Sequence, residues 1–192
     1  MHDIALECRN SDSLRDEVTR LRATIARLED KIVELDRLAH LDPLVGVMNR
    51  RGLMRELESM IARHERQDLP AAVLFVDLDA LKSLNDRHGH DVGDAALVKV
   101  AEVLLRGVRI CDCVARLGGD EFCVLLERSD EASARETAQR LVQLVADAEF
   151  NFAGERVPLS IAVGMTQLQC GDTPHDVLAR ADRAMYRVKA AA

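Results

Sequence analysis

The stretch RLGGDEF (residues 116–122) lies between two apolar runs, 110–115 and 122–126, that are typical of strands. Two adjacent glycines allow the backbone to take positive φ at a hairpin tip, and they let a bulky ligand come close. The carboxylates Asp120 and Glu121 follow as strand residues, so we expect their side chains on opposite faces of the sheet. The stretch therefore predicts a tight hairpin that presents acidic groups.

A second pair of carboxylates, Asp77 and Asp79, ends the apolar run AAVLFVDLD (71–79), which reads as a buried strand. Carboxylates at the ends of two neighbouring strands can converge on a hard divalent cation, and Mg²⁺ prefers such oxygen ligands together with substrate phosphates. Alternatively, these acids only cap solvated turns. The residues alone leave both interpretations open.

The remaining pattern predicts an α/β (α+β) domain, in which a palm-type mixed sheet of about five strands is covered by helices. A hairpin with its turn at Gly154 precedes the apolar run VPLSIAVGMTQL. Helical patterns cover residues 49–66, 92–107 and 130–148, and a last one begins near Thr173 with Pro174 at its first position.

Residues 1–40 predict a separate helix, followed by a globular domain over 41–192. Its apolar residues alternate by four and three, as in a parallel two-stranded coiled coil: Leu14, Val18, Leu21, Ile25, Leu28, Ile32, Leu35 and Ala39. In such a dimer Glu17 faces Arg22 of the second helix, and Lys31 faces Asp36. The alternative is one amphipathic helix packed on its own domain.

Composition excludes several functions. The net charge of −7 argues against non-specific binding to nucleic acid or membranes, which needs a basic face, but not against binding a nucleotide. No uncharged apolar run reaches the roughly 18 residues that a membrane span needs. Five cysteines without CxxC spacing argue against zinc or a disulfide framework, so we expect reduced thiols and a cytoplasmic location.

Several segments occur in an order that resembles the GGDEF family of diguanylate cyclases over about residues 40–190. They are DPLVGVMNRRGL, DLDALKSLND, GHDVGD, RICDCVARLGGDEF, SIAVG and ADRAMYRVK. The resemblance implies an enzyme that joins two GTP molecules into cyclic di-GMP and releases two pyrophosphates. It also implies Mg²⁺ or Mn²⁺ as cofactor, and two monomers that meet face to face, each with one GTP.

The resemblance also implies roles for individual residues. Asp77 and Asp120 match the metal ligands, assisted by the backbone carbonyl of Leu78, and Asp120 also matches the residue proposed to help deprotonate the 3′-hydroxyl. Lys82 resembles the residue that neutralises charge on the phosphates, and Glu121 belongs to the signature.

Four further residues resemble substrate-binding positions. Asn85 and Asp94 match the guanine-reading residues, and their amide and carboxylate can satisfy the edge of that base. His90 lies close to the substrate in this comparison, and Lys189 stands where a basic residue can contact phosphates.

Arg109 and Asp112 form an R-x-x-D pattern that resembles the family's inhibitory site for cyclic di-GMP, where Arg can stack on guanine. The alternative is an ordinary surface ion pair.

A coiled coil would hold two catalytic domains at high effective concentration, and it would connect them to an upstream sensor domain or protein. Two rival functions are a non-catalytic module that binds cyclic di-GMP and, more remotely, a purely structural dimerisation protein.

Overall fold

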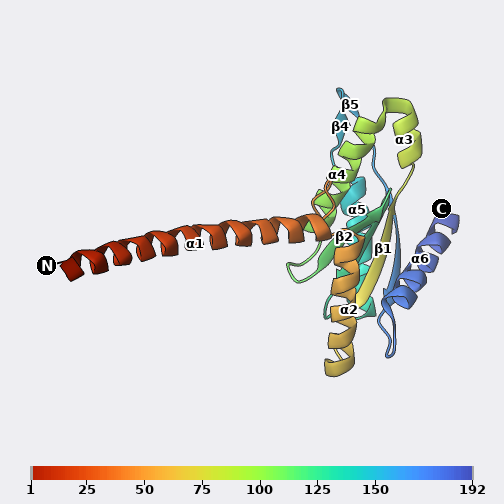
Figure 1. Ribbon diagram of the computed structural model, residues 1–192. Coiled ribbons are helices and arrows are strands. Elements are labelled where there is room, and N and C mark those ends of the chain that lie inside the picture. The colour runs from red at the N-terminus through yellow and green to blue at the C-terminus, as the bar shows by residue number, and fades with distance from the viewer. Residues whose placement is uncertain (1, 192) are drawn as a thin grey trace. The chain divides into compact units, whose positions relative to one another are not determined.

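The computed structural model describes residues 2–191. The chain divides into two compact units with the boundary between residues 39 and 40. The first unit is one continuous helix, α1 (His2–His40), shown in Figure 1. Its heptad residues from Val18 to Leu35 are exposed, with Ile32 65% exposed, so nothing within this unit covers the apolar seam. Leu14 lies outside the residues whose side chains are described. This seam is therefore available to a second helix.

The second unit is built on a four-stranded sheet in the order β2-β3-β1-β6. Its strands are β1 (Ala72–Leu78), β2 (Cys113–Gly118), β3 (Glu121–Leu126) and β6 (Ile161–Gln167). All pairings between these strands are antiparallel. The strand β1 lies between β3 and β6, and every one of its residues is buried, as the apolar run before Asp77 predicts.

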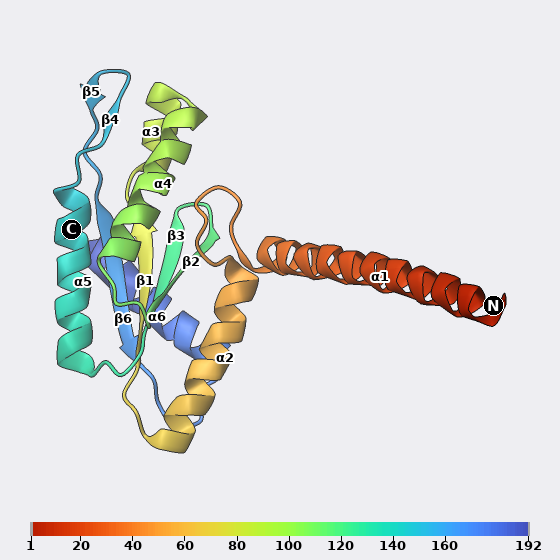
Figure 2. The same cartoon turned by 90° about the vertical axis from the view of Figure 1, so that its left-hand side faces the viewer.

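Helices cover both faces of the sheet, as Figures 1 and 2 show. One core cluster joins the sheet to α4 (His90–Arg106) and α5 (Glu131–Ala146). The other joins the opposite face to α2 (Arg50–Gln67) and α6 (Pro174–Ala191). The short helix α3 (Leu81–His88) follows β1 and packs against α4. The edge where β1 ends is thus placed between α3 and α6.

Local sequence explains where several helices begin. The Asn49 side chain accepts the N–H of Gly52 at the start of α2, and the Asp130 side chain accepts that of Ser133 at the start of α5. Pro174 is the first residue of α6, as its sequence position predicts.

The α+β class is confirmed. The sequence suggested a mixed sheet of about five strands, whereas the main sheet has four strands with antiparallel pairings. The strands β4 (Asn151–Phe152) and β5 (Glu155–Arg156) form a separate hairpin around Gly154. Among residues 2–191, parallel pairing is confined to an isolated bridge between Met48 and Ala115. The strand expected at 110–115 begins only at Cys113.

No helix in the described part of the chain has the length and apolar character needed to cross a membrane.

Candidate functional site

The two predicted metal ligands lie together at one end of the central strands. Asp77 of β1 is paired in register with Glu121 of β3, so their side chains share a face of the sheet. The N–H of Leu78 donates a 3.0 Å hydrogen bond to the carbonyl oxygen of Asp120 in the hairpin tip. The sheet therefore brings Asp77, Leu78 and Asp120 to one place.

Four carboxylates lie close together at this end of the sheet, which we call the acidic edge: Asp77, Asp79, Asp120 and Glu121. Burial raises the pKa of Asp77 above its ordinary value, and repulsion from Asp120 and Asp79 raises it further. Burial also raises the pKa of Glu121, with added repulsion from Asp77 and Asp120. Bringing like charges together in a half-buried position is unfavourable without a counter-charge. The arrangement is suited to binding a cation.

Lys189 supplies a positive charge to this edge from the end of α6. Its ammonium forms an ion pair with Asp77 and lies 3.8 Å from the carboxylate of Asp79. These contacts counteract the rise in the pKa of Asp77. The residue predicted to contact phosphates is therefore next to the acidic edge.

The glycines of the hairpin tip take conformations that favour glycine. Gly118 has φ of +144° and Gly119 has φ of +54°, and a bulge interrupts the strand register between Arg116 and Gly118. A Cβ built at either glycine would meet no atom within 4 Å beyond its chain neighbours, so the space beside this tip is open.

Arg116 anchors the same tip, a role that the sequence analysis did not assign. Its guanidinium donates to the carbonyl oxygen of Gly119 at 2.8 Å and 3.1 Å, and it pairs with Asp42 at 3.3 Å. Asp42 in turn accepts the N–H groups of Leu44 and Val45. Both partners of the ion pair are largely buried, so Arg116 fixes the tip to the loop before α2. The sequence feature that could have indicated this role is the position of Arg116 inside the RLGGDEF stretch.

Asn85 lies in α3, directly against α4. Its side-chain Oδ1 is buried without a hydrogen-bond partner in the described structure. Buried polar groups without partners are uncommon and unfavourable, and they often mark a functional position. The unpartnered Oδ1 therefore marks Asn85 as a candidate functional residue, independently of its sequence motif.

The other three predicted residues of this region are exposed: Lys82, His90 and Asp94. None of the described residues forms a hydrogen bond or ion pair with their side chains. Lys82 lies in α3, while His90 and Asp94 lie in the first turns of α4. The structure thus places them around the α3–α4 junction and leaves their polar groups free.

Arg109 and Asp112 lie at the opposite end of the β2–β3 hairpin. Asp112 accepts the N–H of Arg109 at 2.8 Å and that of Glu127, which follows β3, at 3.1 Å. The side chain of Arg109 is exposed and pairs with no described residue. The surface ion pair considered above is therefore absent between these two residues.

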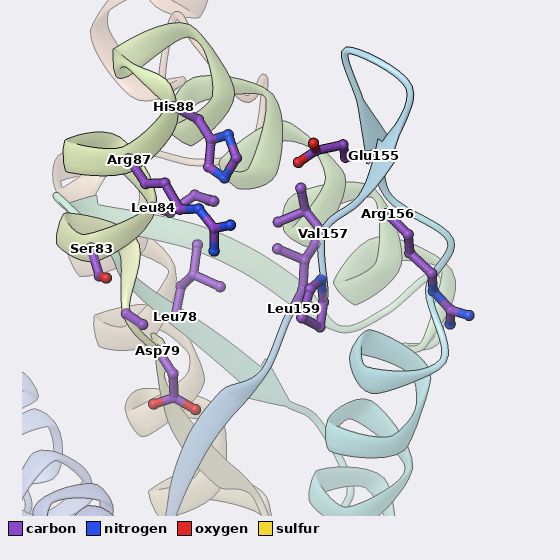
Figure 3. Close-up of a pocket in the computed structure, with 12 residues that line it drawn as sticks. Leu78, Asp79, Ser83, Leu84, Arg87, His88, Glu155, Arg156, Val157 and Leu159 are labelled. Carbon is purple, nitrogen blue, oxygen red and sulfur yellow. The ribbon is translucent and has the colours of Figure 1, made fainter.

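A pocket of about 250 Å³ lies between α3 and the β4–β5 hairpin (Figure 3). Arg87 and His88 reach toward it from α3, and Val157 and Leu159 line its other wall. Leu78 and Asp79, at the end of β1, also line it. This hollow therefore adjoins the acidic edge at Leu78 and Asp79.

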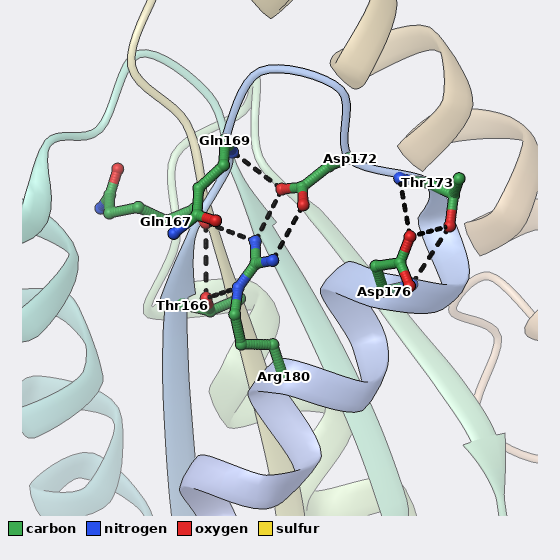
Figure 4. A network of polar contacts seen from close by, with 7 residues as sticks. All are labelled: Thr166, Gln167, Gln169, Asp172, Thr173, Asp176 and Arg180. Carbon is green, nitrogen blue, oxygen red and sulfur yellow. Dashed lines mark hydrogen bonds and ion pairs between the residues drawn. The ribbon is translucent and has the colours of Figure 1, made fainter.

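A polar cluster fixes α6 to the end of β6 (Figure 4). Arg180 forms two hydrogen bonds with Asp172, at 2.8 Å and 2.6 Å, and also donates to Thr166 and to the carbonyl of Gln167. At the start of the helix, Thr173 and Asp176 bond to each other in the manner of a capping box. These contacts help to fix the helix that carries Lys189.

The acidic edge fits a divalent cation that is shared with a ligand. Within the described residues, no group of three or more His, Cys, Asp or Glu side chains could hold a metal ion. Two carboxylates and a backbone carbonyl are nevertheless hard oxygen donors of the kind that Mg²⁺ uses when phosphates complete its shell. The residues present therefore fit a metal that binds together with a phosphate-containing molecule.

The fold and the site define a palm-type domain with an acidic edge. The profile of the family described as "Diguanylate cyclase, GGDEF domain" matches residues 39–192, and the chain belongs to this family.

Curated relatives agree with this assignment. The chain is 38% identical over 189 residues to the bifunctional diguanylate cyclase/cyclic di-GMP phosphodiesterase MucR of Pseudomonas aeruginosa, covering 97% of this chain and 27% of MucR. It is 38% identical over 157 residues to the response regulator PleD of Caulobacter vibrioides, covering 80% of this chain and 34% of PleD. The chain thus spans about a quarter to a third of these relatives.

Solved structures show the same architecture. The coiled coil and GGDEF domain of DgcB from Caulobacter crescentus, in complex with c-di-GMP, matches with a TM-score of 0.87 at 25% identity, over 93% of this chain and 95% of that one. The diguanylate cyclase SiaD of Pseudomonas aeruginosa, in complex with its activator SiaC, matches with a TM-score of 0.79 at 28% identity, over 99% of this chain and 74% of that one.

Proposed function

We propose that this protein is a diguanylate cyclase that condenses two GTP molecules into cyclic di-GMP. The observation that carries the proposal is the joining of Asp77, Leu78 and Asp120 at one sheet edge by the Leu78–Asp120 hydrogen bond. In each of two steps, the 3′-hydroxyl oxygen of one GTP attacks the α-phosphorus of the other, and the bond to the β-phosphate breaks to release pyrophosphate.

In this proposal Asp77, Asp120 and the carbonyl of Leu78 hold Mg²⁺ or Mn²⁺. When bound, the cation neutralises phosphate charge and lowers the pKa of the attacking hydroxyl. Asp120 orients that hydroxyl and helps to accept its proton. Glu121 adds negative charge beside Asp77, which favours cation binding.

The phosphates are bound by cationic side chains. Lys82 is free in the described structure, whereas Lys189 exchanges its contact with Asp77 for the phosphates when the substrate arrives. Phosphoryl transfer depends mainly on such positioning and charge neutralisation. The role of Lys189 is supported by its place at the acidic edge.

The base is recognised at the α3–α4 junction. Asn85 and Asp94 bond to the edge of guanine, and His90 lies beside the substrate. The unpaired Oδ1 of Asn85 supports this assignment. Adenine offers a different set of donors and acceptors, and would leave these polar groups unpaired.

The exposed seam of α1 supports a parallel coiled-coil dimer that brings two half-sites together. The DgcB structure contains a coiled coil, and SiaD is bound by an activator. An upstream domain or protein is therefore expected to control this dimer.

Arg109 and Asp112 form the inhibitory site for cyclic di-GMP in this proposal. The carboxylate of Asp112 is fixed by backbone N–H groups, and the guanidinium of Arg109 remains free to stack on a base. Arg109→Ala should relieve inhibition by added cyclic di-GMP without lowering the initial rate.

The decisive experiment incubates the purified chain with GTP and Mg²⁺ and separates the nucleotides by chromatography. We expect cyclic di-GMP from the parent, and a rate at least about a hundredfold lower from Asp120→Ala. The preparation is first treated with a phosphodiesterase to remove bound cyclic di-GMP. If the treated parent makes no product but binds cyclic di-GMP tightly, the protein is instead a non-catalytic binding module.

A further inference from the structure

The amide of Asn85 occupies the space that a side chain at Gly93 would need. A Cβ built on Gly93 would lie 1.9 Å from Asn85 Oδ1, 2.8 Å from Cγ and 3.1 Å from Nδ2. These are the three atoms nearest to it, and all belong to one amide. Only glycine allows α4 to approach Asn85 this closely.

The backbone does not otherwise require a glycine at this position. Gly93 is buried within α4 and is not among the glycines with positive φ. Glycine inside a helix is less favourable than alanine because it loses more conformational freedom on folding. The contact with Asn85 therefore explains why residue 93 is glycine, whereas helix formation does not.

Asn85 is also constrained from its own side. Its backbone carbonyl accepts the N–H of Gly89 at 2.8 Å, in the turn between α3 and α4. Its Oδ1 is enclosed without a partner. The amide thus packs against α4 and lies beside the backbone that leads directly to Asp94.

We propose that Gly93 is a positioning residue that sets the place of the Asn85 amide and thereby the selectivity for guanine. This inference depends on the proposed function, in which Asn85 and Asp94 read the base. Because a Cβ essentially never lies within 3.0 Å of a heavy atom to which it is not covalently linked, a methyl group at Gly93 would move Oδ1 by about an ångström. Hydrogen bonds to the base weaken steeply over such a distance.

The test compares Gly93→Ala with the parent by calorimetry in Mg²⁺, using α,β-methylene-GTP and inorganic tripolyphosphate as ligands. We expect the variant to bind the nucleotide about tenfold more weakly, the equivalent of one lost hydrogen bond. Its affinity for tripolyphosphate, which has no base, should be unchanged. In the activity assay the KM for GTP should rise, while kcat changes little.

Asn85→Ala and the double variant provide the control. Removing the amide leaves space for the methyl group, so Gly93→Ala should have no further effect on nucleotide affinity in that background and should raise the melting temperature. If Gly93→Ala binds the nucleotide as the parent does while Asn85→Ala binds it weakly, the positioning role is overturned and the proposed function stands. A parent that binds no guanine nucleotide overturns the proposed function itself.

Discussion

The N–H of Leu78 donates a hydrogen bond to the carbonyl oxygen of Asp120, with 3.0 Å between nitrogen and oxygen. This bond joins the end of the central strand β1 to the tip of the β2–β3 hairpin. The backbone therefore fixes the positions from which the carboxylates of Asp77 and Asp120 project. Such preorganisation is what a shared metal site requires.

The acidic edge should control metal affinity directly. Asp77→Asn and Asp120→Asn should each weaken Mn²⁺ binding in the presence of GTP by about tenfold or more, because each removes a charged oxygen ligand. Electron paramagnetic resonance of free Mn²⁺ measures this. The matched control is Asp86→Asn, an exposed acid of α3, which should bind Mn²⁺ like the parent. Equal affinities in all four proteins would contradict the assignment.

Arg116 should contribute strongly to stability because its ion pair with Asp42 is largely buried and it also bonds to Gly119. Arg116→Met should lower the free energy of unfolding by about 1–3 kcal/mol, since it leaves Asp42 and the Gly119 carbonyl with fewer donors. Urea denaturation checks this. Arg106→Met removes an exposed ion pair with Glu102 and should change stability by less than about 0.5 kcal/mol. Similar losses for both variants would show that burial is not the cause.

Gly164 permits the close approach of β6 and α6. A Cβ at this position would lie 2.1 Å from the backbone nitrogen of Met185 and 2.4 Å from the carbonyl oxygen of Ala181. Backbone atoms cannot rotate away, so Gly164→Ala should destabilise the protein by about 1–3 kcal/mol through overpacking. Thermal unfolding measures the change. A variant as stable as the parent would mean that α6 shifts freely on the sheet.

The Arg180–Asp172 pair should make stability depend on pH in the acid range. Hydrogen bonds from Arg180, which is the largest cause, hold the pKa of Asp172 below its ordinary value. A carboxyl group with a lowered pKa stabilises the fold above its unfolded pKa of about 4, and this contribution is lost as the pH falls through the lower, folded value.

Asp172→Asn should therefore reduce the free energy of unfolding by about 1–3 kcal/mol at pH 7, where the parent carboxylate is charged and only 7% exposed. The difference from the parent should shrink as the pH falls through the lowered pKa of Asp172. Urea denaturation across this range provides the measurement. A difference that stays constant with pH would exclude the carboxylate charge as its source.

The α1 seam should determine the oligomeric state. Ile25→Asp and Ile32→Asp place charges at a positions and should convert a dimer into a monomer, as measured by light scattering after size exclusion. Val33→Asp is the control, because Val33 is 69% exposed but lies outside the heptad seam. A parent that is monomeric at micromolar concentration, or a monomeric Val33→Asp, would contradict the parallel coiled coil.

Local patterns predicted much of this architecture. The glycines of the RLGGDEF stretch indicated the hairpin, the apolar run up to Val76 indicated β1, and Pro174 marked the start of α6. These signals succeed because turn conformation, burial on both faces and helix initiation depend on neighbouring residues. The order of motifs also identified the family.

Contacts between distant segments were not predictable in the same way. Residues 110–112 look like a strand, but Asp112 bonds to the N–H of Arg109 and forms a turn instead. The contact of Lys189 with Asp77, the anchoring of the hairpin by Arg116 and the packing of Gly93 on Asn85 each join separate elements. A single sequence does not show which elements become neighbours in the fold, so these contacts could be identified only from the structure.

The central place of β1 has a consequence for the protein during its synthesis. This strand leaves the ribosome before β3 and β6, which later pair with its two edges. Until both arrive, a strand that is apolar except for Asp77 is exposed in the nascent chain with open edges, and such strands readily pair with other molecules. We therefore expect this chain to be most prone to aggregation in the interval before β6 emerges.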